Sequence, residues 1–163
     1  MNFLGSFFRE APKAGFFRGL IFLSFCACNS SLIFDDNHPV PGRWRQSQTI
    51  PFDVVVEDTL SNYDLMIHVR NNGFYRYKDL YLLVYLQSPP GEVTVDTLKL
   101  SVVDVLGRRT GKGIGDLRSH TLMYKQNHHF SASGLYAFRI THYIKSSEIT
   151  GILDLGMTVK SIQ

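Results

Sequence analysis

The chain has 163 residues, with 17 Lys or Arg against 14 Asp or Glu, and an N-terminal leader of 27 residues carries three of the basic residues and one of the acidic ones. The remaining 14 basic and 13 acidic residues balance, so the body lacks the basic field that nucleic-acid binding requires, and its length fits one domain. Because both cysteines, Cys26 and Cys28, lie at the end of the N-terminal apolar run, the body beyond them has no thiol nucleophile, no internal disulfide and no cysteine site for zinc.

Residues 1–27 have the order of an export signal. Scattered basic residues precede a short apolar stretch, residues 20–27, that ends in small side chains. This stretch is far shorter than the roughly 20 apolar residues that a transmembrane helix requires. Ala27 supplies the small residue that precedes the cysteine of a lipobox, where the cysteine is lipidated and becomes the new N-terminus. We therefore expect lipid on Cys28, with a plain secreted chain cleaved near Ala27 as the alternative.

The residues after the leader have no apolar periodicity up to position 42, and they include acidic residues and two prolines. We expect them to form a short irregular tether. Several acyl chains on one cysteine hold a protein on a bilayer far longer than a single chain does, so the rest of the protein can fold in water. The predicted organisation is a signal peptide at 1–27, the lipidated cysteine and tether at 28–42, and one folded domain at 43–163.

Strands are the predicted secondary structure of this domain, because β-branched and aromatic residues are frequent and turn residues separate them. The predicted strands are residues 49–57, 63–70, 80–87, 93–100, 101–105, 122–126, 134–143 and 152–162. Apolar repeats of helical period are almost absent, so we expect little helix and no parallel sheet. Seven or eight short strands indicate an all-β, antiparallel β-sandwich, either a jelly roll or immunoglobulin-like.

A glycine-rich segment at residues 111–116 has some likeness to a phosphate-binding loop. A Walker loop, however, needs Ser or Thr after its Lys and then a helix, and a dinucleotide loop needs a strand before it and a helix after it. Neither context is present. We expect a surface loop instead, whose glycines permit positive φ and whose Asp116 bonds nearby amides.

Histidines are the candidate metal ligands, since His128 and His129 are adjacent and His120 and His142 lie near them in sequence. No acidic residue has diagnostic spacing to them, and neighbours on a strand point to opposite faces of the sheet. We therefore predict no metal site and no cofactor. No arrangement of Ser, His and an acid stands out either, so an enzyme is not expected; a hydrolase would need a pocket that gathers His and carboxylate groups.

Aromatic and basic residues alternate at residues 74–78, and Trp44 stands between two arginines. Trp44, Tyr75 and Tyr77 could form an aromatic face for a sugar or a protein, or they could belong to the core. An exposed row of these rings would favour a surface carbohydrate-binding lipoprotein, and buried rings would argue against it.

Short motifs along nearly the whole chain have the pattern of one known family. They are the lipobox at Cys28, Gly42-Arg43-Trp44, the segment from Arg70-Asn71 to Leu80-Tyr81-Leu82, Asp96-Thr97-Leu98, Gly107-Arg108 with the following 111–117, residues 134–138 and residues 151–156. Together these motifs resemble the gliding-motility lipoprotein GldH family of the Bacteroidota.

The resemblance implies a non-enzymatic, lipid-anchored component of the envelope machinery for gliding, with other gliding or secretion proteins of the envelope as partners. It also makes one loop the candidate interaction surface, through Gly107, Arg108, Gly111, Lys112, Gly113, Gly115 and Asp116. Residues 29–31 after the cysteine are not an acidic export run, which favours the outer membrane, facing the periplasm. The sequence leaves the oligomeric state open.

Overall fold

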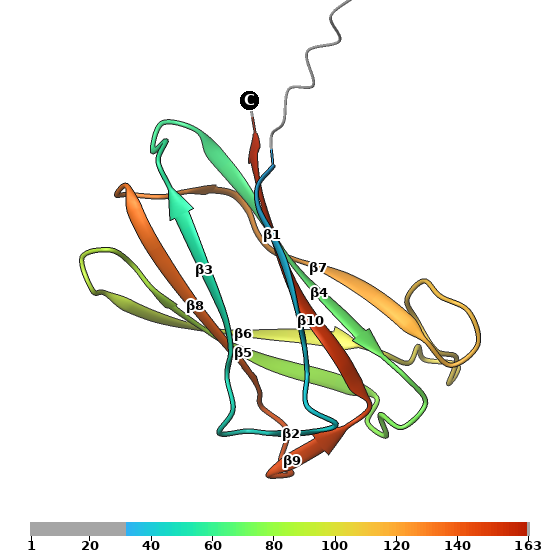
Figure 1. Ribbon diagram of the computed structural model, residues 1–163. Coiled ribbons are helices and arrows are strands. Elements are labelled where there is room, and N and C mark those ends of the chain that lie inside the picture. The colour runs from blue at the N-terminus through green and yellow to red at the C-terminus, as the bar shows by residue number, and fades with distance from the viewer. Residues whose placement is uncertain (1–31, 163) are drawn as a thin grey trace, which may run out of the picture.

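The computed structural model describes residues 32–162, and it contains ten strands and no helix in this range (Figure 1). The strands are β1 (Leu32–Pro39), β2 (Arg43–Arg45), β3 (Ile50–Val56), β4 (Asn62–Asn71), β5 (Asp79–Gln87), β6 (Val93–Ser101), β7 (Arg118–His129), β8 (Gly134–His142), β9 (Glu148–Thr150) and β10 (Ile152–Ile162). No segment between residues 32 and 162 is therefore a helix that could cross a membrane.

Eight of these strands form two four-stranded antiparallel sheets, with the orders β1-β10-β4-β7 and β3-β8-β5-β6. The short strands β2 and β9 pair with each other at one end. Among the eight long strands, the first lies beside the last, and most connections cross from one sheet to the other. This order is that of a jelly roll. The predicted antiparallel β-sandwich is confirmed, and the topology selects the jelly roll over the immunoglobulin-like arrangement.

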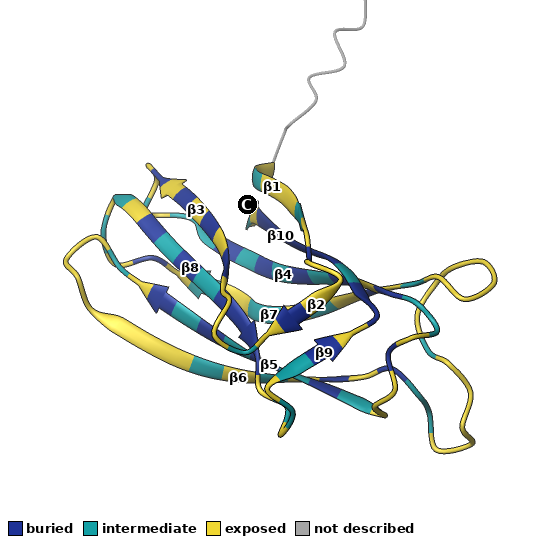
Figure 2. Ribbon diagram, turned by 60° about the horizontal axis from the view of Figure 1, so that its bottom comes forward, coloured by how far each residue is buried: buried dark blue, intermediate teal, exposed yellow. Residues whose placement is uncertain are grey.

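The core lies between the two sheets and is built by alternation along the strands. In β4, the side chains of Leu65, Ile67 and Val69 are buried, and the residues between them are half-buried on the outer face. Figure 2 shows the same alternation along β3 and β8. In β10 six consecutive residues are buried, and on the outer face the side chains of Asp35 from β1 and His68 from β4 lie against Thr158.

Six predicted strands are confirmed to within one residue at each end, namely those at 49–57, 63–70, 80–87, 93–100, 134–143 and 152–162. The segment predicted at 122–126 is the middle of the longer β7. The strand predicted at 101–105 is wrong: β6 ends at Ser101, and Asp104 then accepts backbone N–H groups of the residues that follow it. These bonds turn the chain back, so that Val103 faces Arg109 in an isolated bridge.

The irregular tether predicted up to position 42 is wrong for residues 32–39, which form β1 at the edge of a sheet. Phe34 and His38 point inward, where their rings lie 6.4 Å and 5.1 Å from the ring of Phe52. Asp35 lies on the outer face and accepts a hydrogen bond from Thr158. An edge strand with so few apolar residues has little periodic signal. The predicted signal peptide and Cys28 lie outside the described residues.

The connections gather at two opposite ends of the sandwich. We call one the tether end, because β1 begins there at Leu32 beside the end of β10 (Figure 1). It also holds the turns at residues 57–61, 88–92 and 130–133. The other is the loop end, where β2 and β9 lie with the connections at residues 72–78 and 102–117.

Candidate functional site

The candidate interaction residues lie in the connection at residues 102–117, called here the long loop. Its first half is a tight turn around Asp104. One carboxylate oxygen of Asp104 accepts the N–H groups of Leu106 and Arg108 at 2.8 Å and 2.9 Å, and the other accepts Arg108 Nε at 2.8 Å. The hydrogen bonds from Arg108 hold the pKa of Asp104 below its ordinary value. Gly107, at φ 78°, supplies the left-handed residue of this turn.

The second half of the long loop is a small hairpin that glycine makes possible. Lys112 and Ser119 exchange two backbone hydrogen bonds, of 2.9 Å and 2.7 Å. Gly111 has φ 82°, and a Cβ atom there would lie 2.6 Å from the ring of His120. The expectation of positive φ at the glycines of residues 111–116 is confirmed at Gly111, Gly113 and Gly115, and Gly107 has a positive φ as well.

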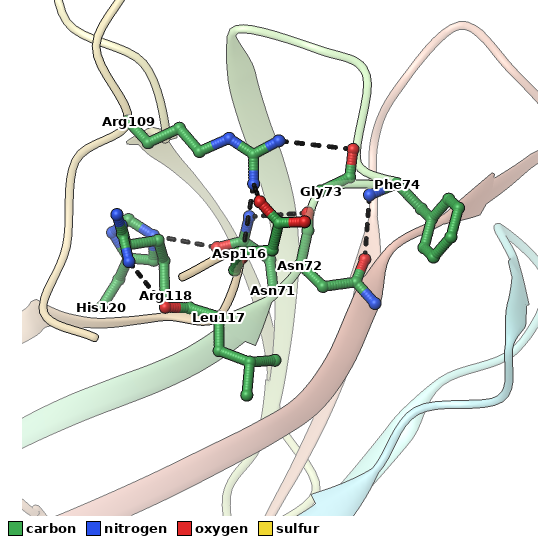
Figure 3. A network of polar contacts seen from close by, with 9 residues as sticks. All are labelled: Asn71, Asn72, Gly73, Phe74, Arg109, Asp116, Leu117, Arg118 and His120. Atoms are coloured by element: carbon green, nitrogen blue, oxygen red, sulfur yellow. Dashed lines mark hydrogen bonds and ion pairs between the residues drawn. The ribbon is translucent and has the colours of Figure 1, made fainter. Parts of the chain in front are cut away.

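Arg109 joins the long loop to the connection at residues 72–78, called here the short loop (Figure 3). Its guanidinium donates to the carbonyl oxygen of Gly73 at 3.4 Å and to that of Asp116 at 3.3 Å. The Asp116 carboxylate lies 3.6 Å from the same guanidinium. The sequence-based expectation that Asp116 bonds amides is therefore replaced by an ion pair with Arg109. The result is that two loops separated in sequence form one structured surface.

A buried polar pair supports this surface from below. His120 Nε2 lies 3.0 Å from Asn71 Oδ1, and both side chains are buried (Figure 3). Burial, and secondarily the charge of Arg118, lowers the pKa of His120. A neutral imidazole can donate to the Asn71 carbonyl oxygen without an unpaired charge in the interior. The base of the long loop is thus held to the end of β4.

The two loops present exposed apolar side chains to solvent. Ile114 and Val105 at the tips of the long loop are 91% and 90% exposed, and Phe74 of the short loop is 72% exposed. Leu106 and Leu117 are exposed as well. All five lie on the two loops of the loop end, and exposed apolar side chains concentrated on one part of a surface mark interaction sites more often than scattered ones do. Sequence reasoning found the glycines and the charged residues Arg108, Lys112 and Asp116 of the long loop, and it assigned Phe74 to a separate aromatic and basic segment. It did not single out Arg109 or these aliphatic side chains.

The predicted aromatic face is not present. Trp44 is fully buried, its Nε1–H donates to the Gln48 carbonyl oxygen at 2.9 Å, and its ring lies 5.3 Å from that of His142. Tyr75 is also buried, and its hydroxyl group donates to the backbone carbonyl oxygen of Asp79. Only Tyr77 of the three is exposed. The core alternative therefore holds for Trp44 and Tyr75, which both belong to the buried hydrophobic core.

The histidines do not gather. Among residues 32–162 there is no group of three His, Cys, Asp or Glu side chains that could hold a metal ion. His128 and His129 border a hollow of about 180 Å³ at the tether end, together with Glu92 and Lys125. The His128 ring packs edge-on against Phe130, and burial lowers its pKa. No hydrogen bond joins the titratable side chains of this hollow to one another among the described residues.

Comparison with known proteins gives a consistent result. Residues 32–159 match the family model described as GldH lipoprotein. The chain is similar to the Gliding motility lipoprotein GldH homolog of Christiangramia forsetii, with 30% identity over 83% of this chain and 88% of that protein. It is also similar to the Gliding motility lipoprotein GldH of Flavobacterium johnsoniae, with 28% identity over 82% of this chain and 87% of that protein.

One solved structure, the infectious bursal disease virus VP2 subviral particle, aligns with 80% of this chain and 32% of that chain. The identity is 10% and the TM-score is 0.37, so this likeness carries no argument.

Proposed function

This chain belongs to the GldH lipoprotein family, and we propose that it is a lipid-anchored, non-enzymatic part of the envelope machinery for gliding motility. The names of the two relatives support the lipoprotein and gliding parts of this proposal. In it, lipid on Cys28 anchors the chain in the outer membrane, the domain faces the periplasm, and the loop end docks other envelope proteins.

One observation carries the docking role: apolar side chains are held in water by a loop whose turns are fixed by hydrogen bonds and ion pairs. Ile114 and Leu106 project from turns that Asp104, the Lys112–Ser119 pair and Arg109 hold together. Such a surface loses little conformational entropy when a partner covers it, which favours affinity. Exposed aliphatic tips of this kind support a protein partner.

The place of the loops supports the same role. The chain enters the domain at Leu32, at the tether end, and β1 is eight residues long. At about 3.3 Å per residue, β1 spans ~23 Å between the two ends of the sandwich. A domain anchored through Cys28 would therefore carry its loop end away from the membrane, where other envelope proteins can reach it.

Two ion pairs of the long loop support docking over catalysis. Arg108 is paired with Asp104, and Arg109 is paired with Asp116. A general acid or base needs a proton-transfer atom that faces a substrate position, whereas these groups face each other and the backbone. Their arrangement fits a structural role in shaping the loop.

Photocrosslinking in the native bacterium tests the proposal. A photoreactive amino acid replaces Leu106 or Ile114, and the matched control replaces Val95, an aliphatic residue of β6 that is 52% exposed far from the loops. We expect envelope-protein adducts from positions 106 and 114, but none from 95. An anchored chain that gives no adduct at either loop position would contradict docking at the loop end.

A genetic experiment connects the loop to motility. The double variant Leu106→Asp and Ile114→Asp should abolish cell gliding while membrane-bound protein stays at the parental level, because a charge on each tip opposes burial against a partner. The control Val95→Asp should glide normally. Normal gliding by the double variant would contradict a role for these tips.

A further inference from the structure

The turn between β3 and β4 holds a leucine in solvent beside the place where the chain enters the domain. Leu60 is 93% exposed. The turn around it is ordered, because one carboxylate oxygen of Asp58 accepts the N–H groups of Leu60 at 2.7 Å and Ser61 at 3.3 Å. The Tyr63 hydroxyl also donates to the Asp58 carbonyl oxygen. Leu60 is therefore held outward by structure and is not the tip of a loose loop.

The strand register places this turn next to the start of β1. Leu32 pairs with Lys160 of β10, and Ile162 of β10 pairs with Asn62 at the start of β4. Because β10 lies between β1 and β4, the axes of these two strands are ~10 Å apart. Leu32, Ile33 and Ile162 are themselves exposed. Four exposed aliphatic side chains thus surround the point of entry at the tether end.

The distance to the proposed anchor is short. Cys28 precedes Leu32 by four residues, so its Cα can lie at most ~14 Å beyond that of Leu32. Leu60 projects in the same direction, since Asn62 already lies two residues, or ~7 Å, beyond the level at which Leu32 pairs. Acyl chains on Cys28 would therefore bring the Leu60 turn to the surface of the bilayer.

We propose that the occupant of this apolar end is the lipid bilayer, with the Leu60 side chain inserted among the lipids beside the anchor. This inference rests on the lipidation of Cys28 proposed above. An aliphatic side chain at the interface gains from burial in the acyl region, and it adds a second point of contact to the lipid. Two contacts ~10 Å apart or more hold the domain upright, so that the loop end points away from the membrane.

Depth-dependent fluorescence quenching tests the orientation. The full chain, processed and acylated in a bacterial host, is reconstituted into phosphatidylcholine vesicles with or without brominated acyl chains. The probe is Leu60→Trp, and the matched control is Ile114→Trp, since Ile114 is 91% exposed at the opposite end. Trp44, the chain's one native tryptophan, is buried and contributes the same background to both variants.

Bromine should remove most of the added emission of the Leu60→Trp variant and leave that of the Ile114→Trp variant unchanged. Vesicle flotation is measured on the same samples. Chain that floats with the vesicles but shows no quenching at position 60, or equal quenching at both positions, overturns the membrane contact and leaves the anchor standing. Chain that does not float overturns the anchor, and the contact with it.

Discussion

The imidazole Nε2 of His142 lies 3.1 Å from the carbonyl oxygen of Trp44, and both side chains are fully buried. Nδ1 of the same ring is buried without a hydrogen-bond partner among the described residues. The neutral ring can therefore donate a hydrogen bond from Nε2 to the Trp44 carbonyl oxygen. A second proton, on Nδ1, would give the ring a buried positive charge and leave that N–H without an acceptor. This pair connects the short β2–β9 ribbon to the sandwich.

Acid should destabilise the domain through this histidine. Burial lowers the pKa of His142 in the folded chain, while the unfolded chain takes up the proton near the ordinary value of 6.5. The free energy of unfolding should therefore be highest above pH 6.5 and fall as the pH drops below that value. Urea unfolding at several pH values, followed by Trp44 fluorescence, measures this slope.

The variant His142→Gln provides the comparison, because its amide can still donate to the Trp44 carbonyl oxygen but does not titrate. His68, His120 and His128 have pKa values lowered by burial too, so the slope should become flatter without vanishing. An unchanged slope in the variant would show that His142 is not a source of the acid sensitivity.

Trp44 should be among the most costly residues to truncate, although it lies in a strand of only three residues. The change Trp44→Ala removes a fully buried ring and its bond to Gln48, and we expect a loss of about 3–5 kcal/mol in the free energy of unfolding. The change Phe74→Ala at the exposed short loop should cost under ~0.5 kcal/mol. Circular dichroism in urea measures both, and similar losses would contradict the burial of Trp44.

The sequence predicted those parts of the fold whose signal is local. Alternation at Leu65, Ile67 and Val69 marks the buried face of β4 without any knowledge of its neighbours. The β1 strand could not be predicted in this way. Its inward residues Phe34 and His38 pack against Phe52, which lies on the other sheet, and no local pattern indicates that contact. Trp44 is a similar case, since its burial depends on pairing with Ile149, far along the chain.

The candidate site divides in the same manner. Positive φ is a property of single residues, so the glycines of the long loop could be predicted from the sequence. The contact of Arg109 with Gly73 joins residues 36 positions apart, and no local pattern indicates it. Among the exposed aliphatic tips, the sequence places Ile114 in a surface loop and Val105 in a strand, but a single aliphatic residue carries no local pattern that indicates how far its side chain is exposed.

Two glycines with nearly equal φ allow the effect of crowding to be separated from that of backbone strain. Gly107 has φ 78° and open space where a Cβ would stand, whereas at Gly111, with φ 82°, that atom would lie 2.8 Å from the Ser119 carbonyl oxygen. Gly107→Ala should cost about 1–2 kcal/mol from strain alone. Gly111→Ala should cost more, because the hairpin of the long loop must also shift.

Hydrogen exchange at Lys112 and Ser119 reports the local part of this cost, and thermal unfolding reports the global part. The amides of this pair should lose protection in Gly111→Ala and keep it in Gly107→Ala. Equal protection in the two variants would show that the backbone has relaxed away from the clash.

Arg109 should matter for order and docking more than for stability. Its ion pair with Asp116 is exposed, and such pairs contribute up to ~1 kcal/mol, so Arg109→Gln should change the midpoint of unfolding little. The hydrogen bond from Arg109 to the Gly73 carbonyl oxygen, however, joins the two loops. Its loss should raise the rate of amide hydrogen exchange across residues 111–117. The matched control is Arg139→Gln. It breaks an exposed ion pair with Asp53 on the β3-β8-β5-β6 sheet.

Photocrosslinking from position 114 then tests whether docking depends on the shape of the long loop or only on the positive charge at position 109. If the long loop must be held in its present form to dock, Arg109→Gln should reduce the yield of envelope-protein adducts while Arg139→Gln retains it. Arg109→Lys should not restore the yield, because an ammonium is a point charge and lacks the planar fork that reaches Gly73 and Asp116 together. Full adduct yield in Arg109→Gln would show that the tips dock without the bridge between the loops, and the docking surface would then be the long loop alone.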